Sequence, residues 1–198
     1  VDAHVHLVRW AGEDSTRLLL ESARRNGIAR LLCSSLGLDR YEVPITVPSM
    51  VAANDYVLRA VDDHPDEIAG LCYACPAFVD EALREVERCV ARGPMVGVKL
   101  WIDAKASDPR AVEVVRAAAA LGVPVLQHAF SKATGNEPFE STPADVAALA
   151  AAVPAARIHM AHLWGCSWRG IAEVAPFPNV CVFKGAATTE TGLLEYAL

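Results

Sequence analysis

The sequence predicts an α/β fold built on a parallel β-sheet, and three observations lead to this prediction. Short apolar runs recur about every 30 residues, which is roughly the length of one strand plus one helix. Amphipathic segments with helix-capping residues separate these runs. The runs themselves are almost continuously apolar, as expected of strands that are covered on both faces. The seven runs are residues 1–8, 28–35, 68–75, 95–101, 123–130, 157–164 and 179–184.

The segments between the runs carry clear helix signals. One segment has an apolar stripe at helical spacing that consists of Val79, Leu83, Val86 and Val90. Two further helices are predicted to begin at Asp108-Pro109 and at Thr142-Pro143, where a capping side chain precedes a proline in the first helical position. Residues 49–64 form another predicted helix, which ends before Pro65.

The composition limits the classes of function and partner. Hydrophobic residues make up 53% of the 198 residues and charged residues 21%, which excludes a disordered chain. The net charge of −6 and the lack of a basic cluster disfavour a nucleic-acid partner, and no apolar stretch is long enough to span a membrane. Six dispersed cysteines, most of them inside apolar runs, indicate reduced thiols and a cytoplasmic location. The expected partner is a small-molecule substrate, and a homodimer is a further possibility.

Two parallel architectures compete for this pattern of strands and helices. A doubly wound sheet usually has a glycine-rich phosphate loop directly after its first strand, and the segment from Val8 to Gly12 has none. A closed barrel instead gathers its chemistry at the carboxyl ends of several strands. Since histidines stand at the ends of three apolar runs, the sequence favours a barrel.

Four histidines are the candidates for a metal site. His4 and His6 end the first run, His128 ends the fifth and His162 ends the sixth. A spacing of two places His4 and His6 on the same face of a strand. Neutral imidazole is a common ligand of zinc-like ions, and catalytic sites use about three protein ligands plus an open water position. A lone pair of histidines would fit a hydrogen-bonded core equally well, but the two additional strand ends favour a metal.

Further candidates stand at the same strand ends. Lys99 ends the fourth run, and three roles are open for it: contact with a substrate carboxylate or the metal site, carboxylation to bridge two metals, or a structural lysine whose head reaches solvent. We favour the first. Trp101, Phe130 and Trp164 lie at or just beyond strand ends, where they either wall a substrate pocket or pack the barrel rim.

These residues together resemble the amidohydrolase superfamily, and within it the amidohydrolase-2, or aminocarboxymuconate-semialdehyde-decarboxylase-like, branch. The matching motifs are Asp2-Ala3-His4-Val5-His6, Gly97-Val98-Lys99-Leu100, Gln127-His128 and Ala161-His162-Leu163-Trp164-Gly165. The resemblance covers essentially the whole chain in the family's order. It implies a TIM-type (β/α)8 barrel with one divalent metal, usually zinc, and a second metal if Lys99 is carboxylated. By position, His4, His6 and His128 would be ligands, while His162 would contact the metal-bound water or the substrate.

The chain departs from the family pattern at its end. The family's last ligand or general base is an Asp at the end of strand eight, whereas this chain covers about seven strand–helix units and stops at Leu198. A barrel of this type needs about 250 residues. We therefore expect residues 1–198 to form a single metal-dependent hydrolase domain that is incomplete at its C-terminus.

The resemblance implies hydrolysis of an amide, ester or lactone bond of a small polar substrate by a metal-activated water, with His162 and Lys99 as catalytic residues. One alternative is metal-dependent, non-oxidative decarboxylation of a small unsaturated or aromatic acid. A metal-dependent nuclease is a weaker rival, because that group has a Glu where Lys99 stands. A last alternative is a barrel relic without activity that binds a small molecule.

Overall fold

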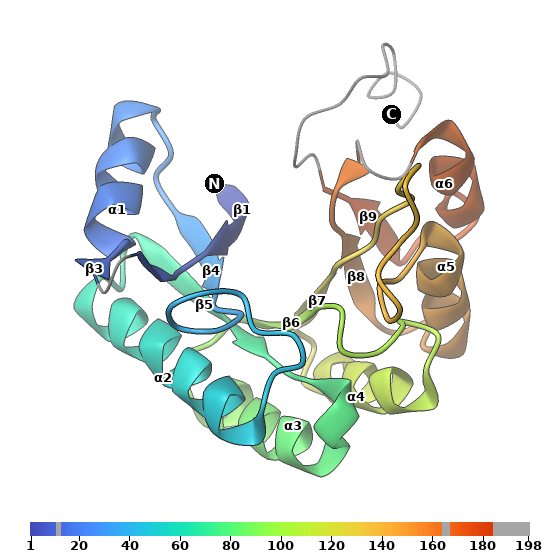
Figure 1. The fold of residues 1–198 in the computed structure, drawn as a ribbon, viewed down its shortest axis with the longest axis horizontal. Helices are drawn as coiled ribbons and strands as arrows, with labels where there is room; N and C mark the ends of the chain where they lie inside the picture. Colours follow the sequence, from blue (N-terminus) through green and yellow to red (C-terminus); the bar gives the residue numbers. More distant parts are fainter. Residues whose placement is uncertain (11–12, 164–166, 184–198) are drawn as a thin grey trace. The chain divides into compact units, whose positions relative to one another are not determined.

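A computed structural model of the chain describes residues 1–10, 13–163 and 167–183. Within these ranges seven strands of parallel sheet alternate with helices, which is the predicted α/β class (Figure 1). The chain divides into two compact units, Val1–Lys99 and Leu100–Leu198, and each is described by itself.

Unit 1 holds four of the predicted strands. They are β1 (Asp2–His6), β4 (Leu31–Ser34), β5 (Ile68–Tyr73) and β6 (Gly97–Leu100), the last of which ends one residue past the boundary of the unit. Each pairs in parallel with the next in this order. Every residue of β5 and β6 is buried, as expected of strands covered on both faces.

The described residues of unit 1 include three α-helices and two short helical turns. They are α1 (Thr16–Arg25), α2 (Val47–Asp63), a 3-10 turn η1 (Pro76–Phe78) and α3 (Val79–Val86), which continues as a π-helical turn η2 (Glu87–Ala91). The predicted helix 49–64 is confirmed as α2. Its N-cap Thr46 accepts a hydrogen bond from the backbone N–H of Ser49, and His64 is its C-cap.

A short antiparallel pair in unit 1 was not predicted. It consists of β2 (Arg9–Trp10) and β3 (Glu13–Asp14), and it directly precedes α1. Two-residue strands are too short to produce a periodic hydrophobic pattern, so the sequence carried no signal for them.

Unit 2 continues the alternation of strands and helices. Its strands β7 (Pro124–Gln127), β8 (Arg157–Met160) and β9 (Val180–Val182) pair in parallel in this order. Its helices are α4 (Pro109–Ala120), α5 (Pro143–Ala152) and α6 (Ser167–Val174). Both predicted N-caps are confirmed: Asp108 accepts from the N–H of Arg110, and Thr142 forms a capping box with Asp145.

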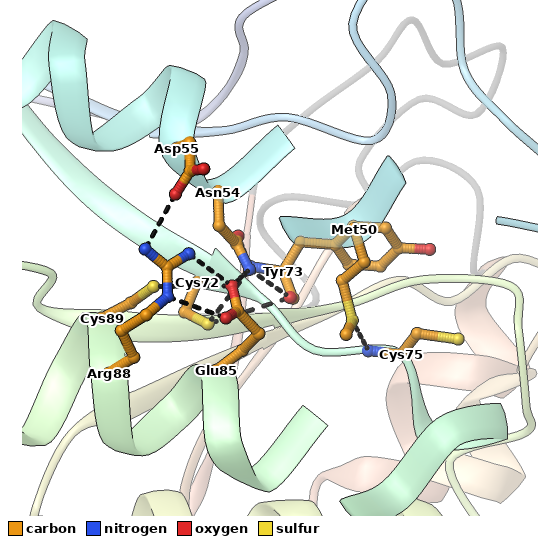
Figure 2. A network of polar contacts seen from close by, with 9 residues as sticks. All are labelled: Met50, Asn54, Asp55, Cys72, Tyr73, Cys75, Glu85, Arg88 and Cys89. Atoms are coloured by element: carbon orange, nitrogen blue, oxygen red, sulfur yellow. Dashed lines mark hydrogen bonds and ion pairs between the residues drawn. The ribbon is translucent and has the colours of Figure 1, made fainter. Parts of the chain in front are cut away.

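A buried polar network ties α2, β5 and α3 together in unit 1 (Figure 2). The side-chain amide of Asn54 accepts a hydrogen bond from the backbone N–H of Tyr73 at 2.8 Å and donates one to the carbonyl of the same residue at 3.0 Å. Asn54 also donates to Glu85 at 2.9 Å, and Arg88 donates to both oxygens of that carboxylate at 2.8 and 2.7 Å. Every side-chain oxygen and nitrogen named here has a partner, so this network is structural.

Three further expectations meet the structure only in part. The described residues include seven strands of the parallel series, and the rest of the seventh predicted strand–helix unit falls on residues 184–198, outside the described ranges. Five cysteines in the described part carry free thiols; four are buried as expected, whereas Cys181 is exposed. Among the described helices, none has the length and apolar character needed to cross a membrane.

Candidate active site

The first part of the candidate site lies on one face of the sheet in unit 1. A Cβ added at Gly70 would touch Val57 and Val61 of α2, so this position of β5 faces the helices. Parallel pairing aligns Gly70 with Cys33 of β4, and Cys33 with Val5 of β1. These positions define the helix face. Since side chains alternate along a strand, the residues that flank them point to the opposite face, which we call the site face.

His4 and His6 flank Val5 and therefore lie together on the site face, as their spacing predicted. Their Nε2 atoms are 3.0 Å apart, and the rings meet edge to face with centroids 4.9 Å apart. On β4, the hydroxyl of Ser34 lies 3.0 Å from Nδ1 of His6. The ring of Tyr41 packs edge-on against His6 at 5.5 Å. One nitrogen of His6 is thus oriented by Ser34, while the other faces His4.

The separation of the two Nε2 atoms fits a metal ion as well as a shared proton. Two imidazole nitrogens that each bind one ion at about 2.0–2.1 Å lie roughly 3.0–3.4 Å apart. The 3.0 Å between His4 and His6 falls within this range. When Nδ1 of His6 donates its hydrogen to the hydroxyl of Ser34, the lone pair is left on Nε2, which is the usual arrangement in metal-binding histidines. The pair is therefore suited to supply two ligands.

Lys99 lies on the same site face. Pairing aligns its neighbour Val98 with Cys72, which contacts Asn54 of α2, so Lys99 points away from the helices. The residue is fully buried, and no described residue makes a hydrogen bond to its Nζ. Burial lowers the pKa of Lys99 to about 7. The structural alternative, in which the head reaches solvent, is wrong because the Nζ atom itself is buried.

The second part of the candidate site stands at the strand ends of unit 2. His128 follows β7 and is buried, whereas His162 follows β8 and is half-buried. Nδ1 of His128 lies 3.2 Å from Nε2 of His162, again a separation that suits two ligands of one ion. The ring of Phe130 packs against both imidazoles, with centroids at 5.5 Å from His128 and 4.6 Å from His162.

His162 has an uncommon backbone conformation. Its φ of 67° lies in the left-handed region, which only a few per cent of residues other than glycine adopt, histidine more often than most. Such conformations cost of order 1–3 kcal/mol and cluster at functional sites. The chain turns out of β8 at this residue, and the turn leaves the imidazole beside His128 rather than in the regular alternation of the strand.

Glu140 belongs to the cluster in unit 2 and was not predicted from the sequence. Its Oε1 lies 2.8 Å from Nε2 of His128, and its Oε2 lies 2.9 Å from the ammonium of Lys132. Burial alone would raise the pKa of Glu140, but hydrogen bonds from Lys132 and His128 outweigh it and leave the pKa below its ordinary value. No pattern distinguished Glu140 from the neighbouring Glu137, which is exposed.

The three aromatic candidates have different outcomes. Phe130 stands next to the paired imidazoles, and the Lys132 ammonium lies 5.6 Å from its ring centroid. Trp101, directly after β6, is 9% exposed. Trp164 lies outside the described residues. Phe130 is therefore placed against two predicted site residues, His128 and His162.

Each unit contributes two of the predicted histidines. Within either unit, the described residues contain no group of three or more His, Cys, Asp or Glu side chains placed to hold a metal ion. The ligand set of His4, His6 and His128 draws on both units, so it stays a prediction.

The family model of the amidohydrolases matches residues 1–192, nearly the whole length of the chain. The chain belongs to the amidohydrolase family. The branch inferred from the histidine motifs is thereby confirmed. No curated protein matches the sequence.

Several solved structures share the fold of this amidohydrolase. The 2,6-dihydroxybenzoate decarboxylase from Rhizobium has a TM-score of 0.66 at 15% identity, with 92% of this chain and 72% of that one covered. A 5-carboxyvanillate decarboxylase from Novosphingobium aromaticivorans, complexed with manganese and a nitrobenzoic acid, has a TM-score of 0.60 at 16% identity, over 81% and 50% of the chains. A TIM-barrel protein from Bordetella bronchiseptica has a TM-score of 0.63 at 17% identity, over 84% and 58%. The predicted barrel class is confirmed.

Proposed function

We propose that this amidohydrolase is a metal-dependent, non-oxidative decarboxylase of small aromatic or unsaturated carboxylic acids. The observation that carries the proposal is its likeness to decarboxylases of two aromatic acids, 2,6-dihydroxybenzoate and 5-carboxyvanillate. The surroundings of Phe130 support the same substrate class, because an aromatic ring can stack beside it.

Three histidines are the proposed metal ligands: His4, His6 and His128. The close approach of His4 to His6 supports the assignment. When bound, a divalent ion acts as a Lewis acid that polarises an oxygen of the substrate. The sequence predicted zinc, and the manganese in a structurally similar decarboxylase makes manganese an equal candidate.

The other site residues have separate proposed roles. Decarboxylation breaks the bond between the carboxylate carbon and the ring or vinyl carbon, which must then accept a proton as carbon dioxide leaves. His162 is the proposed proton donor at that carbon, a common role for an imidazole near neutral pH. Lys99 is proposed to bind an anionic group of the substrate, since its buried amine would thereby gain the partner that it lacks among the described residues. Trp101, Phe130 and Trp164 are the proposed pocket walls.

Hydrolysis of an amide, ester or lactone is the second candidate. It is favoured by the histidine motifs that place the chain in the amidohydrolase family, because the same ligands can serve to activate water. Both reactions would take place at the same residues. The choice between them therefore depends on the substrate and not on the metal.

A paired-substrate assay tests the proposal. The purified protein is loaded with Zn²⁺ or Mn²⁺ and offered hydroxybenzoic acids alongside esters, anilides and lactones of the same ring. Release of carbon dioxide from the acids, abolished by a chelator and by His4→Ala but retained in a His64→Asn control, is the expected result. Turnover of the esters or lactones alone would establish hydrolysis instead. A protein that binds neither metal and turns over neither set would be a relic, and the proposal would be wrong.

A further inference from the structure

Glu140 is a buried carboxylate in an otherwise exposed loop. Most residues of the segment 131–139 are exposed, yet Glu140 is 2% exposed. Its carboxylate accepts three hydrogen bonds, from the ring of His128, from the ammonium of Lys132 and from the backbone N–H of Glu137 at 3.0 Å. A charge is normally buried only when it is paired and hydrogen-bonded, and Glu140 meets both conditions.

The charge of Glu140 determines the proton position on His128. An ionised carboxylate can only accept hydrogen bonds, so the Nε2 of His128 at 2.8 Å must carry a hydrogen. In the neutral imidazole the lone pair then resides on Nδ1, the atom that lies 3.2 Å from His162.

We propose that Glu140 is a positioning residue, which holds the His128 ring and keeps its proton on Nε2 so that Nδ1 is the atom presented for ligation. The inference rests on the proposed metal site, in which His128 is a ligand. It adds a residue that touches neither the proposed metal nor the proposed substrate. Carboxylates that hydrogen-bond the second nitrogen of a ligand histidine raise its basicity, and their loss typically lowers metal affinity 10–100-fold.

The loop after β7 is built to hold this carboxylate in place. The side chain of Asn136 accepts from the N–H of Lys132 at 2.9 Å and donates to the carbonyl of Phe130 at 2.7 Å, which closes the loop on itself. The N–H of Phe130 in turn donates to the carbonyl of Ser141. Lys132 is thereby kept beside Glu140, where its ammonium balances the buried negative charge.

Two measurements on Glu140→Gln test the proposal, with Glu137→Gln as the matched control in the same loop. In the metal-free protein, proton NMR should show a downfield, slowly exchanging Nε2–H of His128. That resonance should move upfield and exchange faster in Glu140→Gln and stay unchanged in Glu137→Gln. Competition against a chromophoric chelator should show Zn²⁺ and Mn²⁺ affinities 10–100-fold weaker in Glu140→Gln and unaltered in the control.

The outcomes separate this proposal from the proposed function. If wild-type protein binds neither metal, the proposed function fails, and the ring-proton comparison alone decides the role of Glu140. If the ring proton and the metal affinities of Glu140→Gln match those of the wild type, the proposal is overturned. Should Glu140→Gln not fold, Glu140→Asp keeps the charge opposite Lys132 but withdraws the oxygen from His128, and the same two shifts are expected.

Discussion

The two faces of β5 and β6 in unit 1 differ in how their buried ionisable groups are paired. On the helix face, the buried carboxylate of Glu85 is paired with Arg88 and hydrogen-bonded by Asn54 (Figure 2). On the site face, the amine of Lys99 is fully buried, and no described residue hydrogen-bonds it. Glu85 thus has an ion pair and hydrogen bonds, whereas the buried amine of Lys99 has no hydrogen-bond partner among the described residues.

The difference teaches which buried groups serve the fold and which serve the site. The Glu85 network joins α2 to α3 and holds the backbone of Tyr73, so its interactions stabilise the fold. Lys99 makes no comparable contribution to the fold. Burial depresses its pKa to about 7, and burying this ionisable group lowers the free energy of unfolding. A group with a strongly shifted pKa and no hydrogen-bond partner in the described part of the chain, on the face that carries His4 and His6, is a candidate for function.

Breaking the helix-face network should have the largest effect. Glu85→Ala leaves Arg88 and Asn54 without their shared partner. We expect a loss of about 3 kcal/mol, the lower end for a buried ion pair, because Arg88 is 41% exposed and keeps its pair with Asp55. Urea denaturation measures the change in the free energy of unfolding. Glu81→Ala is the control on the same helix, since its exposed pair with Arg84 is worth about 0.3–0.5 kcal/mol. Equal losses in the two variants would contradict the structural role of the network.

Removing the buried amine of Lys99 should increase the free energy of unfolding, whereas breaking the Glu85 network should decrease it. Lys99→Met should raise the free energy of unfolding by about 1–4 kcal/mol near pH 7, because an apolar side chain replaces a buried ionisable one. The same variant should lose activity, since stability and function conflict at such a site.

The pH dependence of this gain follows from the sign of the shift. Between a folded pKa of about 7 and an unfolded value of 10.5, the unfolded chain binds more protons, so wild-type stability rises with pH through this window. The advantage of Lys99→Met is therefore complete below pH 7 and vanishes as the pH rises toward 10.5. Lys105→Met, which alters an exposed lysine, should stay within about 0.5 kcal/mol of wild type. If the gain in the free energy of unfolding of Lys99→Met did not change with pH, Lys99 would not have the lowered pKa that burial is expected to cause.

The smallest effect is expected at Ser34. Its hydroxyl lies 3.0 Å from Nδ1 of His6, so Ser34→Ala should weaken Zn²⁺ or Mn²⁺ binding about tenfold by releasing the ring. Chelator competition measures this change. The neighbouring Ser35→Ala is the matched control, because that buried hydroxyl donates to the carbonyl of Gly37 and not to a histidine. A tenfold loss in both variants would indicate general loosening of β4 rather than orientation of His6.

The sequence by itself determined the strands, the helix caps and the family. Strands such as β5 are continuous apolar runs, and caps such as Asp108 and Thr142 are local patterns, so hydrophobic periodicity and capping chemistry were enough to locate them. The side-by-side placement of His4 and His6 followed from the two-residue period of a strand.

Only the tertiary structure decided which groups are paired. Glu140 and Glu137 look alike in the sequence, but folding of the loop buries one against His128 and leaves the other exposed. Lys99 could have reached solvent, but the register of β5 against β6 places it on the site face, and its Nζ is buried there. Hydrogen-bond partners distant in the chain leave no periodic trace, because they depend on how elements pack and not on the order of residues within one element.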